Sequence, residues 1–141
     1  MLRGCEYEFL HSATVGIISN RAKHGISAMS MPIQVITTTG KREDADRIAQ
    51  ALIESRLAAC VQVLGPITST YRWRGQIETA EEWQCCAKSR QDLYPEVEAA
   101  IRQLHPYEVP EILAIAVLEG NASYLAWLDG ELKPPPRFSQ A

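Results

Sequence analysis

From residue 32 onward, hydrophobic residues recur along the chain with regular spacings, and these spacings predict its secondary structure. The β-branched run IQVITTT at residues 33–39 predicts a short strand. Apolar positions at intervals of three and four then predict a helix that ends near Arg56. A strand at LAACVQVL, residues 57–64, comes next, and we expect Gly65–Pro66 to interrupt it.

The second half of the chain repeats this alternation. Residues 68–89 read TSTYRW, RGQ and IETAEEWQCCAKS, which predicts a long hairpin. A helix with one apolar face follows over residues 93–104, then the strand ILAIAVL at 112–118 and a short helix at 122–132. The order strand, helix, strand, strand, helix, strand predicts an α+β domain with the ferredoxin-like βαββαβ fold and a short C-terminal helix.

The regular pattern covers only part of the sequence. Residues 1–31 show no sustained period, so we expect a poorly ordered N-terminal extension. The folded domain should span residues 32–133, and residues 134–141 should form a proline-rich tail. We expect a cytoplasmic protein, and a plastid location would follow if residues 1–31 were a transit peptide.

The predicted strands are too apolar for a single subunit. In a ferredoxin-like fold the helices cover one face of the sheet, and the other face should alternate polar with apolar residues. However, ILAIAVL is entirely apolar, and LAACVQVL has only Gln62 as a polar member. Each such side chain contributes about 1.5–3 kcal/mol when buried, so we predict a homo-oligomer. The aromatic residues expected at its interface are Tyr71, Trp73, Trp83, Tyr107 and Trp127.

Charge and composition exclude several classes of protein. The net charge of −3 over 141 residues argues against a nucleic-acid binder, which needs a concentrated basic face. No apolar run approaches the roughly 18 residues of a membrane-spanning helix. The four cysteines lack C-x-x-C spacing, which favours buried free thiols in a reducing compartment. No catalytic constellation emerges, so we predict that the protein is not an enzyme and requires no cofactor.

The segment HPYEVPEI, residues 105–112, carries the candidate chemistry. Its prolines restrict their own backbone and bias the preceding residues toward extended geometry, so the segment should be a stiff connector. Imidazole and carboxylate suit Cu(II), Zn(II) or Ni(II), which makes His105 and Glu111 candidate metal ligands. The alternative is a purely structural corner that aims the last strand at a subunit boundary.

Four segments together resemble the CutA family, the divalent cation tolerance proteins. These are LAACVQV, TSTYRWRGQIE, HPYEVPEI and YLAWL, in this order, within residues 33–132. The resemblance implies a tight homotrimer, similar to the PII signalling proteins, with three sheets facing inward. It also implies copper binding, with His105 and Glu111 as ligands. The first-strand cysteine of copper-binding members falls at Thr37, which favours weak binding of Cu(II) or another borderline divalent ion over Cu(I).

Three alternatives stay open beside this hypothesis. A PII-like signalling or scaffold trimer would bind a small molecule or partner protein in clefts between subunits. The turn TTTGKRED, residues 37–44, would either collect an anion at a helix N-terminus or simply start the helix, and its missing first glycine excludes a Walker motif. Asn121 would either be glycosylated within NAS or cap a helix.

Overall fold

The computed structural model describes residues 30–135, and it confirms the predicted order of elements. The elements are β1 (Pro32–Thr39), α1 (Arg42–Glu54), β2 (Cys60–Trp73), β3 (Gln76–Arg90), the 3-10 turn η1 (Gln91–Leu93), α2 (Tyr94–Leu104), β4 (Leu113–Ala116) and α3 (Ala122–Glu131). The expectations for residues 1–29 and for residues 136–141 lie outside the described residues. No helix in the described range is long and apolar enough to cross a membrane.

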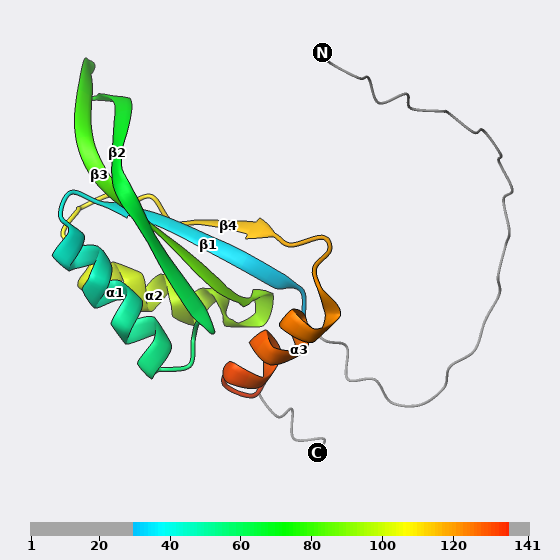
Figure 1. Ribbon diagram of the computed structural model, residues 1–141. Coiled ribbons are helices and arrows are strands. Elements are labelled where there is room, and N and C mark those ends of the chain that lie inside the picture. Colours follow the sequence, from blue (N-terminus) through cyan, green and yellow to red (C-terminus); the bar gives the residue numbers. More distant parts are fainter. Residues whose placement is uncertain (1–29, 136–141) are drawn as a thin grey trace, which may run out of the picture.

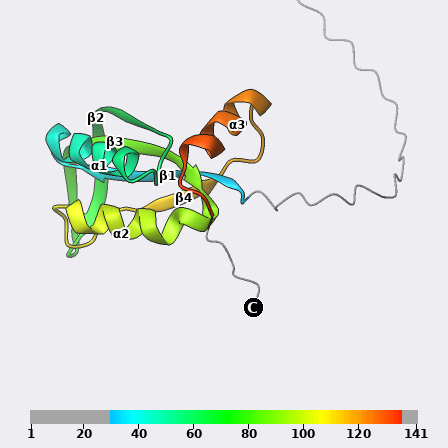
Figure 2. The same cartoon turned by 90° about the horizontal axis from the view of Figure 1, so that it is seen from below.

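The sheet has the topology of the ferredoxin-like fold. Its strands lie in the order β2-β3-β1-β4, and every neighbouring pair is antiparallel (Figure 1). Viewed from below, α1 and α2 lie next to each other in front of the sheet, so both cover the same face (Figure 2). The predicted α+β class and its helix-on-one-face arrangement are therefore confirmed.

The core lies between this covered face and the two helices. Ile33 and Val35 point into it from β1, because alternate residues of a strand share a face. The helices contribute residues spaced three or four apart, which form one stripe on each helix. The buried members of the core cluster on the helices are Ile48 and Leu52 of α1 and Val97 and Ile101 of α2.

Gly65–Pro66 interrupts the pairing of its strand, as predicted, but does not end the strand. β2 continues to Trp73 with a shift of register between Leu64 and Ile67, and β3 pairs with it on both sides of the shift. The indole of Trp83 occupies the space beside Gly65, where an added Cβ would lie 2.5 Å from the ring. Because only glycine accepts so close a contact, the irregularity is accommodated within the sheet.

We call the contact of Gly65–Pro66 with Trp83 the joint. Beyond this joint, β2 and β3 leave the body of the molecule as a two-stranded arm. We define the arm as residues 67–82, because the pairing of β3 with β1 stops at the pair Thr39–Trp83. The arm projects well past the other strands (Figure 1). A two-stranded ribbon is at best marginally stable in water without further contacts.

The uncovered face of the sheet is less uniformly apolar than expected. Leu113 and Ile115 of β4 are 54% and 51% exposed, as the prediction required. In the middle of the face, however, strand pairing places Gln62 beside Cys86, and the Lys88 ammonium donates to the Gln62 amide oxygen. The expectation concerned β2 and β4. It is confirmed at β4, and on β2 the side chain of Leu64 is 48% exposed on this face, with Gln62 as the polar exception already evident in the sequence. β4 is also shorter than the predicted residues 112–118.

Arg90 fastens α3 to the end of the core. Its side chain is only 4% exposed, and it donates to the carboxylates of Asp92 and Asp129, each at 2.8 Å, and to the carbonyl of Lys133. The Arg90 hydrogen bond lowers the pKa of Asp92 below its usual value. The buried cation is therefore fully paired, which is the condition for tolerating it in a core.

Truncation of a core side chain tests this assignment. Ile48→Ala should lower the free energy of unfolding by about 2–5 kcal/mol, because it opens a cavity between α1 and the sheet. Ile53→Ala is the matched control, since it removes the same atoms from a side chain of the same helix that is 42% exposed. Denaturant unfolding at equal protein concentration measures both, and equal losses would contradict the placement of Ile48.

Candidate functional site

The proline-bracketed segment connects α2 with β4 and begins at a buried histidine. His105 ends α2 with φ −76° and ψ 132°, the extended geometry expected before a proline. Its side chain is 9% exposed, and its ring centroid lies 5.0 Å from that of Tyr107. The extended geometry predicted for the residue before Pro106 is thus confirmed, and the stiffness of the connector stays a prediction.

Both ring nitrogens of His105 already have hydrogen-bond partners. Nδ1 lies 3.1 Å from the backbone nitrogen of Tyr107 and must accept its proton. Nε2 lies 2.8 Å from the carbonyl oxygen of Thr38, which only accepts, so Nε2 must carry a proton. This arrangement describes a neutral imidazole that ties the connector to β1 and has no free lone pair.

Glu111 reaches the same residue of β1. Its Oε2 atom accepts a hydrogen bond of 3.3 Å from the hydroxyl of Thr38. The structure therefore brings His105 and Glu111 together, one on the carbonyl and the other on the hydroxyl of Thr38. Glu111 itself is exposed, so its carboxylate remains accessible to solvent.

A second polar pair links the connector to β3. The hydroxyl of Tyr107 donates to Oε1 of Glu82 at 2.9 Å, and Glu82 is only 7% exposed. Burial, followed by the hydrogen bond to Glu82, raises the pKa of Tyr107 to about 12. Gly40 makes room for this contact, since the Tyr107 hydroxyl lies 3.0 Å from where a Cβ would be.

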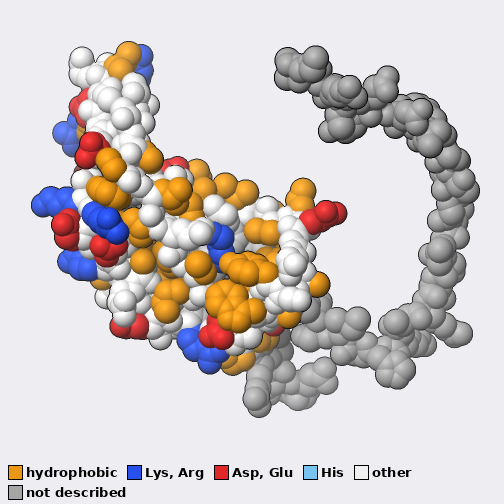
Figure 3. Space-filling model, viewed as in Figure 1, with side chains coloured by type: hydrophobic (Ala, Val, Ile, Leu, Met, Phe, Trp, Pro, Cys, Tyr) orange, Lys and Arg blue, Asp and Glu red, His pale blue; other side chains and the backbone are white. Residues whose placement is uncertain are grey.

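These residues border a cavity of about 780 Å³ between the arm and the connector. Its lining residues are Thr38, Ser69, Thr70, Tyr71, Arg72, Trp73, Glu78, Glu82, Pro106, Tyr107, Glu108, Val109 and Glu111. The set contains four carboxylates and a single guanidinium, which donates to the carbonyl of Gly75 in the turn of the arm. Figure 3 shows acidic, basic and hydrophobic side chains close together where the arm leaves the body.

Comparison with known proteins places this chain among relatives of one kind. The family model of the CutA1 divalent ion tolerance protein matches residues 33–131, which include every strand and helix from β1 to α3 except Pro32. The chain belongs to the CutA1 family. The resemblance inferred from its sequence is therefore confirmed.

Individual relatives agree with the family match. The divalent-cation tolerance protein CutA of Thermus thermophilus is 43% identical over 94 residues, which cover 67% of this chain and 91% of the relative. Protein CutA of Mus musculus is 44% identical over 84 residues, covering 60% of this chain and 48% of the mouse protein. The crystal structure of CutA1 from Oryza sativa aligns with a TM-score of 0.73 at 33% identity, over 76% of this chain and 98% of that one.

The metal site implied by CutA1 membership does not fit the residues of one subunit. His105 has no free ring nitrogen, and Thr37 stands where a soft ligand would be expected. Within residues 30–135, no three His, Cys, Asp or Glu side chains are grouped closely enough to hold a metal ion. His105 and Glu111 as metal ligands thus stay a prediction for the assembled protein.

The five predicted interface aromatics lie in three places in this CutA1-family chain. Tyr71, Trp73 and Tyr107 line the cavity. Trp83 packs against Gly65, with the Arg42 guanidinium 5.3 Å from its ring centroid. Trp127 is exposed on α3. Their role in subunit contacts stays a prediction.

The remaining candidates take structural places. Asn121 caps α3, with its side-chain oxygen accepting from the backbone of Tyr124 at 3.1 Å. Cys85 and Cys86 lie on opposite faces of the sheet, opposite Thr37 and Ile36 respectively, as strand geometry predicts. Burial raises the pKa of the Cys85 thiol to about 11, and the thiol donates to the carbonyl of Ala45. Burial therefore disfavours the thiolate form of Cys85.

Sequence reasoning missed Glu82 as a site residue. It lies beside Glu81 in the sequence, and neighbouring residues of a strand point to opposite faces of the sheet. The structure confirms that separation, because Glu81 is exposed and Glu82 is buried. The available signal was the period of β3, which places Glu82 on the same face as Cys86.

The Tyr107–Glu82 contact predicts a pH dependence of stability. An unfolded tyrosine loses its proton near pH 10, whereas the pKa of Tyr107 in the folded protein is about 12. The stability that this group contributes is complete below pH 10 and is lost as the pH rises toward 12, because the unfolded state then binds fewer protons. Tyr107→Phe should therefore lose less stability over this window than the wild type. Denaturation midpoints measured from pH 8 to 12 test this, and identical curves would contradict it.

Proposed function

We propose that this CutA1-family protein contributes to divalent-cation tolerance as a homotrimer that binds divalent ions weakly at the acidic cavity. The observation that supports this proposal most directly is the imbalance of charge in the cavity. Glu78, Glu82, Glu108 and Glu111 line it, and the single guanidinium is turned toward the end of the arm. Oxygen donors of this kind suit hard and borderline divalent cations. Because no three such donors are grouped within the described residues of one subunit, a second copy would have to supply the remaining ligands.

The metal-donor atoms available in this cavity predict weak rather than tight binding of a divalent ion. Glu111 is exposed and supplies an accessible carboxylate beside Thr38. For His105 to join as a second ligand, its ring must give up the hydrogen bond from Tyr107 or the one to Thr38. Each lost bond reduces the net gain from metal coordination, so binding should be weak. The oxygen and imidazole donors favour Cu(II) over Cu(I), which prefers soft sulfur ligands.

The trimer is supported by the surface of the single subunit. Leu113, Ile115 and Leu118 follow one another along β4 and beyond it, and all are strongly exposed. β4 is also an edge strand of the sheet, with unpaired backbone groups along its outer side. Contact between copies would cover both the apolar side chains and the edge.

The proposal is non-enzymatic and places the protein in the cytoplasm. Tolerance of an ion requires that it be bound or buffered, which needs no covalent step. Cys60, Cys85 and Cys86 are free thiols, and free cysteines suit a reducing compartment.

A second candidate is a PII-like trimer that binds a small molecule or a partner protein. It is favoured by the size of the cavity, since about 780 Å³ is within the range of small-molecule sites, and by its aromatic walls. The two candidates differ in the ligand and share the location.

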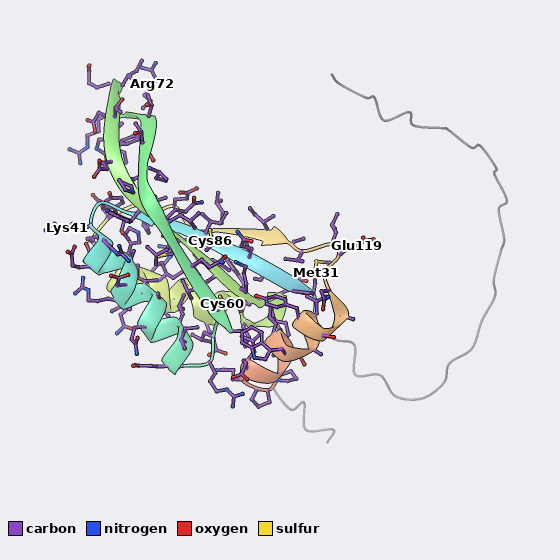
Figure 4. The ribbon with its side chains drawn as sticks, in the orientation of Figure 1. Met31, Lys41, Cys60, Arg72, Cys86 and Glu119 are labelled. Atoms are coloured by element: carbon purple, nitrogen blue, oxygen red, sulfur yellow. The ribbon has the colours of Figure 1, made fainter. Side chains whose placement is uncertain are left out.

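A titration with variants tests the metal proposal. Glu111→Gln should weaken Cu(II) binding roughly tenfold or more, because it neutralises the accessible carboxylate. Glu119→Gln is the control, since Glu119 lies beyond β4, away from the arm (Figure 4). Calorimetry with Cu(II), Zn(II) and Ni(II) measures the affinities, and an unchanged Glu111→Gln affinity would exclude this ligand. His105→Ala, measured in the same way, decides whether the imidazole takes part.

Sedimentation tests the trimer. Ile115→Lys should reduce the wild-type trimer to smaller species, because it places a charge in the proposed contact. Ile53→Lys serves as control, being a comparably exposed isoleucine on the outer side of α1. A wild type that sediments as one folded subunit at nanomolar dilution would exclude the trimer.

A further inference from the structure

The C-terminal helix α3 buries little of its own surface against the rest of the protein. Within the helix only Leu128 is buried, whereas α1 buries three residues and α2 buries two. Leu132, just beyond the end of α3, is the other buried leucine of this region, at 2% exposure. Because most helices in proteins are stabilised by the packing of an apolar face, α3 depends more than α1 and α2 on its polar contacts.

Arg56 holds the C-terminal end of α3 from the turn between α1 and β2. Its guanidinium donates to the carbonyls of Gly130 and Glu131, each at 2.8 Å. Its own carbonyl accepts a hydrogen bond of 2.9 Å from the amide of Lys133. The last carbonyls of a helix have no partner within the helix, so a cation from another element both satisfies them and favours the negative end of the helix dipole.

Arg90 makes the second fastening, from the end of β3. It donates to the Asp129 carboxylate at 2.8 Å, and with α3 in place it is only 4% exposed. Asp92 in η1 holds the same guanidinium at 2.8 Å and belongs to the body of the protein. If α3 moved away, Arg90 would lose Asp129 but keep Asp92. Opening therefore does not leave a buried cation without a partner, which would be the most costly outcome.

The connection between β4 and α3 has the properties of a hinge. A backbone hydrogen bond of 3.0 Å from the Val117 amide to the Pro32 carbonyl extends the pairing of β4 with β1, and α3 begins at Ala122. Residues 118–120 between them are exposed and belong to no helix or strand. The helix itself lies at the end of the sheet that is away from the arm (Figure 1). Rotation within residues 118–120 would swing α3 without breaking the sheet.

We propose that α3 is a strap that opens as a unit about residues 118–120, while the sheet and the helices α1 and α2 stay folded. In the closed state it covers Arg90 and seats Leu128 and Leu132 against the core. In the open state the Arg90 guanidinium and the seats of both leucines become accessible at the end of the sheet. The strap goes beyond the proposed function and does not depend on it, since none of its contacts involves a residue of the cavity.

Hydrogen exchange of the full-length protein, followed by mass spectrometry at low concentrations of urea, tests the strap. The amides of α3 should exchange about a hundredfold or more faster than those of β1 and β3, because a local opening exposes them without global unfolding. Their exchange should also depend only weakly on urea, since the opening exposes little surface. Equal rates and an equal urea dependence in α3 and β3 would overturn the proposal, and contacts between copies that hold α3 closed would produce that result.

Variants of the two fastenings show whether these contacts control the opening. Arg56→Ala should raise the exchange rate of the α3 amides about fivefold or more and leave β1 and β3 unchanged, because it removes hydrogen bonds to two helix carbonyls. Asp129→Asn should act in the same direction by removing the charge that faces Arg90. Arg47→Ala is the matched control, since it removes the same side chain from α1, where Arg47 pairs with Asp44 of its own helix.

The two variants cover each other. Arg56 has a positive φ of 57°, so its replacement also affects the turn before β2, whereas Asp129→Asn leaves that turn intact. Equal acceleration of α3 and β3 in Asp129→Asn would show that the helix opens only with the body, and would overturn the strap. Unchanged α3 exchange in both variants would do the same, because the two arginine contacts would then not be what holds the helix closed.

Discussion

The regular alternation of β3 is the constraint on which the rest of the structure depends. This strand pairs with β1 over Trp83–Arg90 and with β2 over nearly its whole length, so its side chains are committed to one face or the other. On the helix side it supplies Ala87 and Cys85 to the core, and Trp83 to the joint beside Gly65. On the other side it supplies Glu82. A slip of one residue would exchange the two sets, placing a carboxylate in the core and an indole in the cavity.

The connector supplies the residues that contact β1 and the Glu82 side chain of β3. His105 and Tyr107 are two residues apart in a segment stiffened by proline, and they make different contacts: the imidazole binds the backbone of β1, and the phenol binds the carboxylate of Glu82. The histidine thereby fixes the position from which the tyrosine reaches the cavity. Both ring nitrogens of His105 are used in hydrogen bonds that hold the connector in place. For this reason a histidine in a motif suggestive of metal binding offers no free nitrogen within one subunit.

Most of the fold, and less of the site, could be predicted from the sequence. The helices were readable because Ile48, Leu52, Val97 and Ile101 fall on single stripes, and the topology followed from the order of elements. The continuity of β2 through Gly65–Pro66 could not be predicted from the sequence, because it depends on the contact with Trp83, which is distant in sequence. The cavity depends likewise on contacts between the arm, β1 and the connector, and no local pattern encodes the pairing of Tyr107 with Glu82. The Thr38 contacts that unite His105 and Glu111 were hidden for the same reason.

Pro66 limits which extended peptides can pair with the outer edge of β2. β2 is an edge strand, and an uninterrupted edge of this length would offer a continuous row of amide donors to any extended peptide. A proline has no amide hydrogen, and the register shift beside it bends the row. The edge is thereby divided into a short segment on the body and a longer one on the arm. A foreign strand would find the hydrogen-bonding row of β2 broken at Gly65–Pro66, which protects this edge of the sheet from indiscriminate fibrous self-association.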